Sequence, residues 1–244
     1  MSNVTVVLWR HAPTPANAAG QLQGQADTEP GAEGLALGRV AARRLLDLYG
    51  TPTAVYSSPL RRAVATAELL GYPVEVEPGV NQRSYGVWEG MTITQVAREY
   101  PDELAVRDAG GDPDIPGWET SDQVGRRVAG AIEAQCASVL SRLESGILLG
   151  DEPSPPEPGM RVQDGALLAA ASKNPGATGA TDAAQKSPVL VFASHGSAIA
   201  TGLRRLLGLP EEPQIFGYLH HANWVELHRN NGVWRVERYD YGVS

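Results

Sequence analysis

The stretch VTVVLWRH, residues 4–11, decides the fold class of this chain. Its first six residues are apolar or β-branched without alternation, which is typical of a strand buried on both faces of a parallel sheet. The pair Arg10 and His11 follows this run at once. Ligands of open α/β sheets bind beyond the carboxyl ends of the strands, so we expect this pair to lie at the binding edge of such a sheet.

Two further runs, 54–56 and 189–193, share this continuous apolar character and predict two more buried strands. Helical patterns separate the strands, and helices are expected over 34–48, 60–70, 121–143 and 197–207. In the third of these, apolar residues recur at spacings of three and four, the period of an amphipathic helix. Strands alternating with helices predict an α/β fold: a doubly wound, mostly parallel sheet with helices on both faces.

The last part of the chain predicts an antiparallel hairpin at one edge of the sheet. Strand-like segments at 223–228 and 234–239 flank Asn230-Asn231-Gly232, and Asn-Gly is a favoured hairpin turn. Residues 146–188 hold six of the eighteen prolines and lose apolar periodicity. We therefore expect a single domain over 1–244, with 146–188 as a flexible, low-complexity insertion.

Composition limits the partners. Nucleic acids and anionic membranes require a broad basic surface, which a formal net charge of −8 does not provide, so neither is expected as a partner. The first apolar run is too short to span a bilayer and lacks a signal-peptide pattern, so a cytoplasmic location is expected. The single cysteine, Cys136, fits a reducing compartment and is expected to fill the core.

Residues suited to anion binding follow each of the three predicted strands. Arg10 and His11 follow the first, Ser57-Ser58 and Arg62 the second, and His195 the third. These loops should meet at one crevice, because the carboxyl ends of parallel strands share an edge. A neutral imidazole is a nucleophile near pH 7, and arginines hold the charge of a transferred phosphoryl group with paired donors. The pattern predicts phosphoryl transfer to His11, clamped by Arg10, Arg62 and a protonated His195.

Taken singly, each of these residues has a simpler interpretation. An Arg-His pair after a strand is often a surface turn, and His195 alone could be a core histidine. The adjacent His220 and His221 are expected on a strand, pointing to opposite faces, one buried and one solvated, so they cannot chelate one metal.

Six segments, in this order along the chain, resemble the histidine phosphatase superfamily with its phosphoglycerate-mutase-like branch. They are 8–14 with Asn17, 23–27, 57–63 with Thr66 and Ala67, 85–90, 116–120 and 194–196. The resemblance implies a phosphohistidine intermediate on His11, phosphoryl binding by Arg10, Arg62 and His195, and neither metal nor cofactor. Further contacts to phosphate or substrate are expected from Thr14, Asn17, Gln23, Gly24, Arg83 and Gly196.

The chain departs from the family at the position of the general acid. Where most members have glutamate in a Leu-Asn-Glu-Arg type segment, this chain reads Val80-Asn81-Gln82-Arg83. Gln82 cannot deliver a proton, and general acid catalysis is worth about 10²–10⁴-fold, so an alkoxide should leave slowly. Three alternatives stay open. Glu89 could serve as the acid, although its Glu-Gly pair resembles a structural feature of the family. The leaving group could need no acid, as in phosphohistidine or an anhydride, or the protein has lost turnover and kept phosphate binding. Ala12, where the family usually has Gly, could also crowd the site.

The resulting expectation is a phosphatase that hydrolyses a small phosphorylated metabolite, with low turnover because Gln82 replaces the acid. The first alternative is a catalytically weak or inactive phosphate-binding regulatory homologue. The second is a phosphoglycerate-type mutase. The sequence leaves open which metabolite is the substrate, and also the oligomeric state, a homodimer included.

Overall fold

The computed structural model describes residues 3–146, 187–210 and 215–243. In this part of the chain a six-stranded sheet has the order β3-β2-β4-β1-β5-β6. Its strands are β1 Val4–Arg10, β2 Ala54–Ser57, β3 Val74–Val76, β4 Val189–Ser194, β5 Trp224–Asn230 and β6 Val233–Tyr241. β1 to β4 are mutually parallel, whereas β5 is antiparallel to β1. The predicted α/β class, a mostly parallel sheet with an antiparallel edge, is confirmed.

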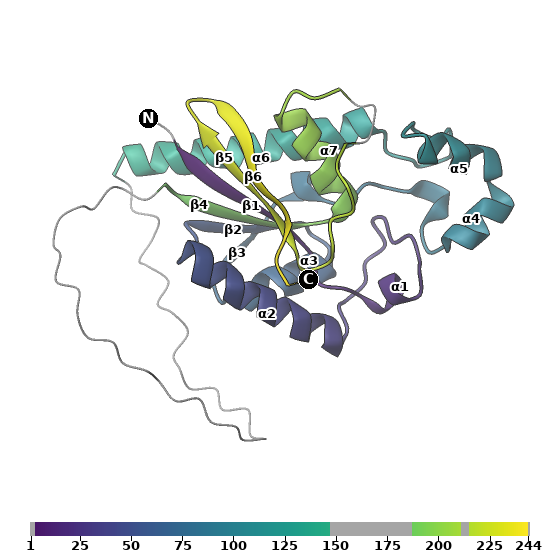
Figure 1. Cartoon of the computed structure of the whole chain (residues 1–244), viewed down its shortest axis with the longest axis horizontal. Helices are drawn as coiled ribbons and strands as arrows, with labels where there is room; N and C mark the ends of the chain where they lie inside the picture. Colours follow the sequence, from purple (N-terminus) through teal and green to yellow (C-terminus); the bar gives the residue numbers. More distant parts are fainter. Residues whose placement is uncertain (1–2, 147–186, 211–214, 244) are drawn as a thin grey trace, which may run out of the picture.

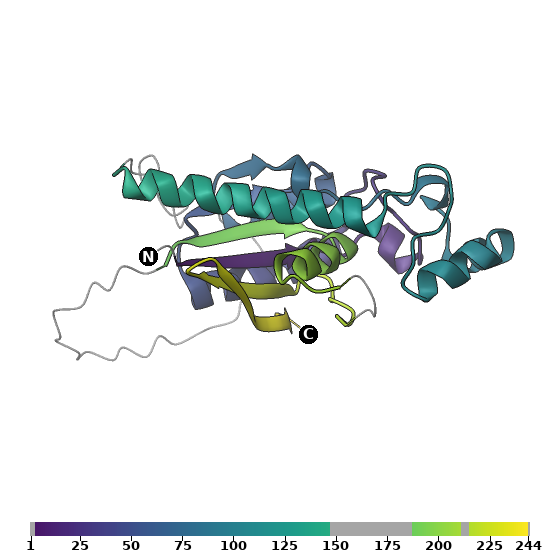
Figure 2. The same ribbon diagram turned by 90° about the horizontal axis from the view of Figure 1, so that it is seen from above.

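Helices cover both faces of the sheet, α2 and α3 on one side and α6 and α7 on the other (Figures 1 and 2). The helices are α1 Pro15–Ala18, α2 Ala32–Tyr49, α3 Arg61–Ala67, α4 Ile93–Glu99, α5 Pro101–Asp108, α6 Ser121–Glu144 and α7 Gly196–Leu206, with short 3₁₀ helices at Glu68–Leu70, Pro78–Val80 and Gly86–Trp88. In β1, Val6 and Leu8 pack toward α6 and α7, whereas Val7 and Trp9 pack toward α2 and α3. Burial on both faces explains the continuous apolar run.

The predicted helix at 121–143 is α6, which lies along one face of the sheet (Figure 2). A capping box between Thr120 and Gln123 starts it, since each side chain bonds the other's backbone N–H. Val124, Val128 and Cys136 lie on its buried face. Burial raises the pKa of the Cys136 thiol to about 12, and the side chain fills the core as predicted.

The predicted C-terminal hairpin is β5 and β6, joined by a two-residue turn. Asn231 and Gly232 have φ angles of 51° and 82°, and two successive positive φ values match the twist of a β-hairpin. Both strands are longer than their predicted cores, 223–228 and 234–239. The hairpin extends the sheet by pairing β5 with β1.

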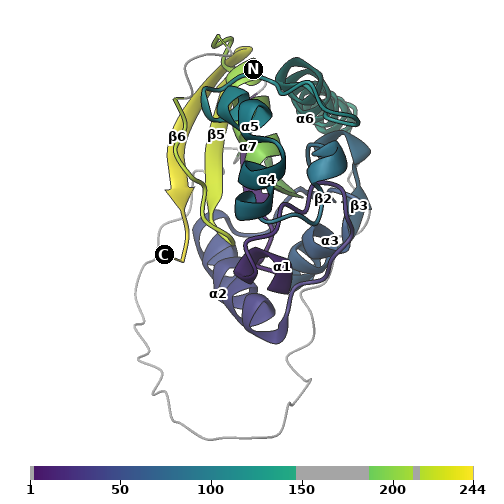
Figure 3. The ribbon, with the colours of Figure 1, turned by 90° about the vertical axis from the view of Figure 1, so that its right-hand side faces the viewer.

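Among the strands and the helices of at least seven residues, β3, α4 and α5 were not predicted from the sequence, and neither were the short α1 and the 3₁₀ helices at Pro78–Val80 and Gly86–Trp88. β3 is a three-residue edge strand with two exposed residues, and α5 buries no residue, so neither has a strong apolar pattern. Figures 1 and 3 show α4 and α5 beyond the end of the sheet toward which β1 runs.

The insertion predicted at 146–188 falls almost entirely outside the described residues. None of the helices in the described part of the chain combines the length and apolarity needed to cross a membrane.

Candidate active site

The carboxyl ends of β1, β2 and β4 bring four predicted residues together. Arg10 at the end of β1 pairs in register with Ser194 of β4, so the residues that follow, His11 and His195, become neighbours. Their ring centroids are 5.1 Å apart. Arg62 enters from the first turn of α3, after β2, and all four side chains are buried.

His11 is set up as a neutral imidazole with a free nitrogen. Its Nδ1 lies 2.8 Å from the carbonyl oxygen of Ala12. A carbonyl only accepts hydrogen bonds, so Nδ1 carries the proton and Nε2 keeps its lone pair. Burial, with the positive charges of Arg62 and Arg10, holds the pKa of His11 well below its usual value. The Ala12 side chain lies against Gly38 of α2, a contact with the helix behind the loop.

Arg62 is held by main-chain carbonyls of the loop before α2. Nη1 donates to Ala26 O at 2.8 Å and Nη2 to Gly24 O at 2.6 Å. Burial lowers the pKa of Arg62 to about 10, which leaves the guanidinium charged at neutral pH. Gly24 has a φ of +53°, and a Cβ there would lie 2.1 Å from Glu89 Oε1. Glycine is needed here because the Glu89 carboxylate closely approaches this backbone.

Arg10 is fixed by the loop before β5. Its Nη1 donates to Leu219 O, and its Nη2 lies 2.8 Å from His221 Nε2. Because arginine only donates, His221 Nε2 must accept, so the ring is neutral. Burial, together with the charge of Arg10, lowers the pKa of His221 to about 3. Gly196 makes room for this arginine, since a Cβ there would lie 3.3 Å from Arg10 Cζ.

Sequence reasoning missed His221, whose ring centroid is 5.3 Å from that of His11. We expected His220 and His221 on a strand, but they precede β5 and lie in or beside a turn. His220 is exposed and bonds Asp240, whereas His221 is half-buried. His221 is distinguished by its side-chain contacts with Arg10 and His11, and no sequence pattern encodes them.

His195 is fully buried and its Nε2 lies 2.7 Å from Ser58 Oγ. Burial and the nearby charge of Arg62 hold the pKa of His195 well below its usual value, which favours the neutral ring over the protonated one expected from the sequence. Among the described residues, His195 Nδ1 has no hydrogen-bond partner, and neither has Arg10 Nε or Arg62 Nε. The two arginine Nε atoms carry protons, and His195 Nδ1 carries one when Nε2 accepts from Ser58 Oγ. Unsatisfied buried donors are costly, so this cluster has the chemistry to bind an oxyanion.

Three further predicted residues form a network around helix α1. Thr14 and Asn17 make its capping box, with Thr14 N donating to Asn17 Oδ1 at 3.0 Å. Thr14 Oγ1 also donates to Gln23 Oε1 at 3.0 Å. These bonds shape the loop after His11, and direct contact of these side chains with phosphate stays a prediction.

Gln82 is buried beside α7. Its Oε1 accepts from Arg83 N at 2.9 Å and from Ser197 Oγ at 2.7 Å. A carboxylate oxygen in the same position would accept the same two bonds. Glu89 instead accepts from the main-chain N–H groups of Gln25 and Tyr85, so its carboxylate holds two loops together.

A cavity of about 290 Å³ has Arg83 and Ser197, which both bond the Gln82 side chain, in its wall, whereas Gln82 itself and the four clustered residues lie outside its lining. Arg83 also bonds Asp112 at 3.3 Å, and its Cζ lies 5.2 Å from the centroid of the Trp118 ring. The residues with full charges that line the cavity are Arg83, Arg107, Arg204, Arg205, Asp108 and Asp122. With four arginines and two aspartates, the wall is positive overall.

Known proteins resemble this chain in sequence and in structure. The family model described as the histidine phosphatase superfamily, branch 1, matches residues 6–142. A glucosyl-3-phosphoglycerate phosphatase of Mycolicibacterium vanbaalenii is 28% identical over 231 residues, which cover 91% of this chain and 83% of that protein. A metal-independent phosphoserine phosphatase of Arabidopsis thaliana is 36% identical over 140 residues, 54% of this chain and 58% of the relative.

A 2,3-bisphosphoglycerate-dependent phosphoglycerate mutase of Rhodococcus jostii is 34% identical over 110 residues, 42% of this chain and 44% of the mutase. Among solved structures, the native mycobacterial glucosyl-3-phosphoglycerate phosphatase superimposes with a TM-score of 0.71 at 26% identity. That superposition covers 98% of this chain and 100% of the other.

Proposed function

The chain belongs to the histidine phosphatase superfamily, branch 1, and we propose that it hydrolyses a small phosphorylated metabolite through a phosphohistidine on His11. One observation carries the proposal: a buried, neutral His11 with a free Nε2 lies in the electrostatic field of Arg62 and Arg10. Such an imidazole is nucleophilic at neutral pH, and the two guanidinium groups attract a phosphate dianion to it.

The reaction takes two displacements at phosphorus. The lone pair of His11 Nε2 attacks, the bond from phosphorus to the ester oxygen breaks, and the leaving alkoxide takes a proton from water. A second water then attacks the phosphohistidine, the P–N bond breaks, and His11 regains its lone pair. One proton of this water stays on the released phosphate, and the other neutralises the hydroxide formed in the first step.

Arg10, Arg62 and His195 bind the phosphoryl oxygens in this proposal. Phosphoryl transfer places negative charge on three equatorial oxygens, and fixed donors that are already desolvated stabilise it most effectively. The buried Arg10 Nε and Arg62 Nε, which lack partners among the described residues, support this assignment. His195 Nδ1 is a third such donor when Nε2 accepts from Ser58 Oγ.

The identity of residue 82 limits the leaving groups. Gln82 stands where most family members carry glutamate, and its amide has no acidic proton to give. Alkyl phosphates should therefore turn over slowly, while aryl or acyl phosphates, whose leaving groups are already stable anions, should react faster.

The cavity beside Gln82 supports a substrate with a second acidic group. Its positive wall would attract a carboxylate on the part of the substrate that is not transferred. Two relatives are named for glucosyl-3-phosphoglycerate and phosphoserine, both of which carry a carboxylate near the phosphoester.

The test is phosphate release from a substrate panel by the wild type and by His11→Ala. We expect release by the wild type alone, together with a ³²P-labelled protein that withstands alkali, as phosphohistidine does. His220→Ala is the matched control, because His220 is exposed and lies outside the cluster. Equal release by wild type and His11→Ala would overturn the proposal.

The residue at position 82 also favours a second candidate, a phosphate-binding protein with no turnover. Calorimetry would then detect binding of inorganic phosphate, weakened by Arg62→Met, while no burst of labelled phosphoprotein formed with any substrate.

A further inference from the structure

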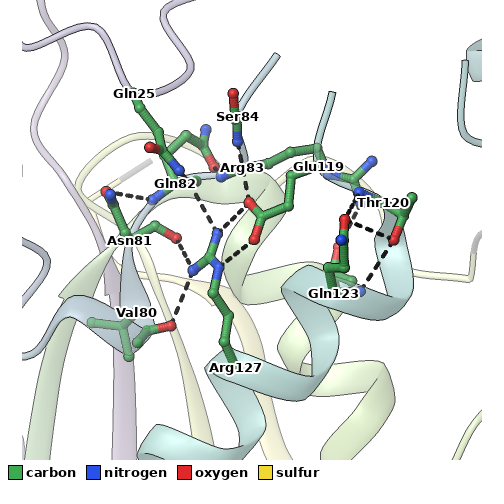
Figure 4. Close-up of polar contacts among 12 residues, drawn as sticks. Gln25, Val80, Asn81, Gln82, Arg83, Ser84, Glu119, Thr120, Gln123 and Arg127 are labelled. Carbon is green, nitrogen blue, oxygen red and sulfur yellow. Dashed lines mark hydrogen bonds and ion pairs between the residues drawn. The ribbon is translucent and has the colours of Figure 1, made fainter. Parts of the chain in front are cut away.

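We propose that Arg127 is a positioning residue for the side chain at position 82, and that Glu119 holds Arg127 in place for this role. The inference rests on the proposed function, because it concerns how the leaving-group side of that same site is built. Arg127 lies on α6, and its side chain extends from this helix to the loop that carries Gln82 (Figure 4).

The guanidinium of Arg127 binds the main chain of this loop at three places. Nη1 donates to Gly79 O at 3.0 Å and to Asn81 O at 2.7 Å, and Nη2 donates to Gln82 O at 3.0 Å. Three carbonyls on one rigid, planar group fix the directions of their peptide planes. Since a side chain leaves the backbone at an angle set by those planes, Arg127 determines where the side chain of residue 82 points.

Glu119 fixes the orientation of this guanidinium. Arg127 Nε lies 2.6 Å from Glu119 Oε1 and Nη2 lies 2.8 Å from Oε2, a two-point pairing that only arginine offers. The exposed fractions of the two side chains are 24% and 18%, so water screens the pair only in part. Glu119 Oε2 also accepts from Ser84 N at 3.2 Å. The pair therefore holds the chain on both sides of residues 82 and 83.

Other bonds hold the loop as well. The N–H groups of Val80 and Asn81 donate to Glu77 O and Pro78 O, and Ser197 Oγ donates to the Gln82 side chain. Ser194 Oγ donates to Val80 O at 2.7 Å, and Gln25 Nε2 donates to Gln82 O at 3.0 Å. Neither contact reaches the carbonyls of residues 79 and 81. Without Arg127, the loop would keep these contacts but lose the bonds to the carbonyls of residues 79 and 81 and one of the two bonds to the carbonyl of residue 82.

A lysine at position 127 would keep the charge but replace the planar fork with a single ammonium group. It could pair with Glu119 or bond part of the loop, but it could not reproduce the two-point pairing and all three carbonyl bonds together. A misplacement of about 1 Å in a site can reduce rate by about 10²-fold, so this conservative change is a sensitive probe.

The experiment is a double-mutant cycle of wild type, Gln82→Glu, Arg127→Lys and the double variant. The substrates are 3-phosphoglycerate, an alkyl phosphate whose leaving group needs a proton, and p-nitrophenyl phosphate, whose leaving group does not. With 3-phosphoglycerate we expect Gln82→Glu to raise kcat/KM by about 10²–10⁴-fold when Arg127 is intact. In the Arg127→Lys background the gain should be about 10–100-fold smaller. With p-nitrophenyl phosphate the gain should be absent in both backgrounds.

Arg126→Lys is the matched control, since Arg126 is the adjacent residue on the same helix but is exposed and pairs with Asp122. Its background should leave the Gln82→Glu gain at its full size. Thermal unfolding of every protein shows which variants are folded. If Arg127→Lys does not fold, Glu119→Gln replaces it in the cycle, and the same reduction in the gain is expected.

Three results separate the possibilities. An equal Gln82→Glu gain in both backgrounds, with all rates lowered by one factor, would mean that Arg127 only stabilises the fold and would overturn the inference. No gain in either background would also overturn it, because position 82 would then not face the leaving group. Release of phosphate that does not depend on His11 would defeat the proposed function itself, whatever the cycle gives.

Discussion

Acid should destabilise this protein through the buried histidines of the site, and His221 gives the clearest measure. Its pKa is lowered from 6.5 to about 3 by burial and by Arg10. A lowered histidine pKa means that the unfolded chain binds a proton more readily than the folded one. The free energy of unfolding is therefore unaffected above pH 6.5 and falls as the pH drops from 6.5 toward 3.

The size of the effect follows from the shift. At pH 5 the pH is about 1.5 units below the ordinary histidine pKa, and each unit corresponds to about 1.4 kcal/mol. Between pH 7 and pH 5, His221 alone should therefore lower the free energy of unfolding by about 2 kcal/mol. The pKa values of His11 and His195 are lowered in the same direction, and both add to the loss. Ordinary carboxylates titrate mostly below pH 5, so this window isolates the histidines.

The assay is urea unfolding of the wild type and of His221→Asn at pH 8, 7, 6 and 5. The loss between pH 7 and pH 5 should be about 2 kcal/mol smaller in the variant, because the variant lacks one group that takes up a proton on unfolding. Between pH 8 and pH 7 neither protein should lose stability through these histidines. Equal losses in both proteins between pH 7 and pH 5 would refute the assignment of His221 as a half-buried, neutral hydrogen-bond acceptor for Arg10.

Other predictions follow from the same geometry. Gln82→Glu should create an acid at the leaving group, so kcat for alkyl phosphates should acquire a high-pH limb that the wild type lacks, detected in a pH–rate profile. Arg62→Lys should lower kcat/KM by about 10²-fold or more, because one ammonium cannot keep both carbonyl bonds and bind phosphate, and steady-state kinetics would show it. Gly24→Ala should lower the free energy of unfolding by about 1–3 kcal/mol in urea melts, since it combines a positive φ with a collision at Glu89. 3-Phosphoglycerate should show a higher kcat/KM than glycerol 3-phosphate, which has an uncharged hydroxymethyl group in place of the carboxylate, and steady-state kinetics would compare the two.

Much of the fold could be predicted because its strongest signals are local. Residues 4–9 and 189–193 are buried on both faces of the sheet, which leaves a continuous apolar run in the sequence. The hairpin turn at Asn231-Gly232 depends on residue types that tolerate positive φ. β3 and α5 escaped prediction because they bury too little side-chain surface to impose a period.

In the candidate site too, residues marked by a local sequence pattern could be predicted, and a residue placed only by a tertiary contact could not. His11, Arg62 and His195 could be found because each follows a strand, and strand ends meet by topology. His221 could not, because its part in the cluster is a contact with a guanidinium from a residue 211 positions away in the chain. The sequence singled out Gly24 as a phosphate contact but could not show that its backbone accommodates the Glu89 carboxylate.

The walls of the cavity beside Gln82 differ in how tightly their helices pack against the rest of the protein. On one side are residues of α6 and α7, such as Gly125 and Ala200, which belong to helices packed on the sheet. On the other are Arg107 and Asp108 of α5, a helix with no buried residue. Substitutions at Arg107 or Asp108 would change the cavity wall without removing a buried residue. Under the proposed function, the preferred metabolite can therefore change during evolution while the cluster around His11 stays the same.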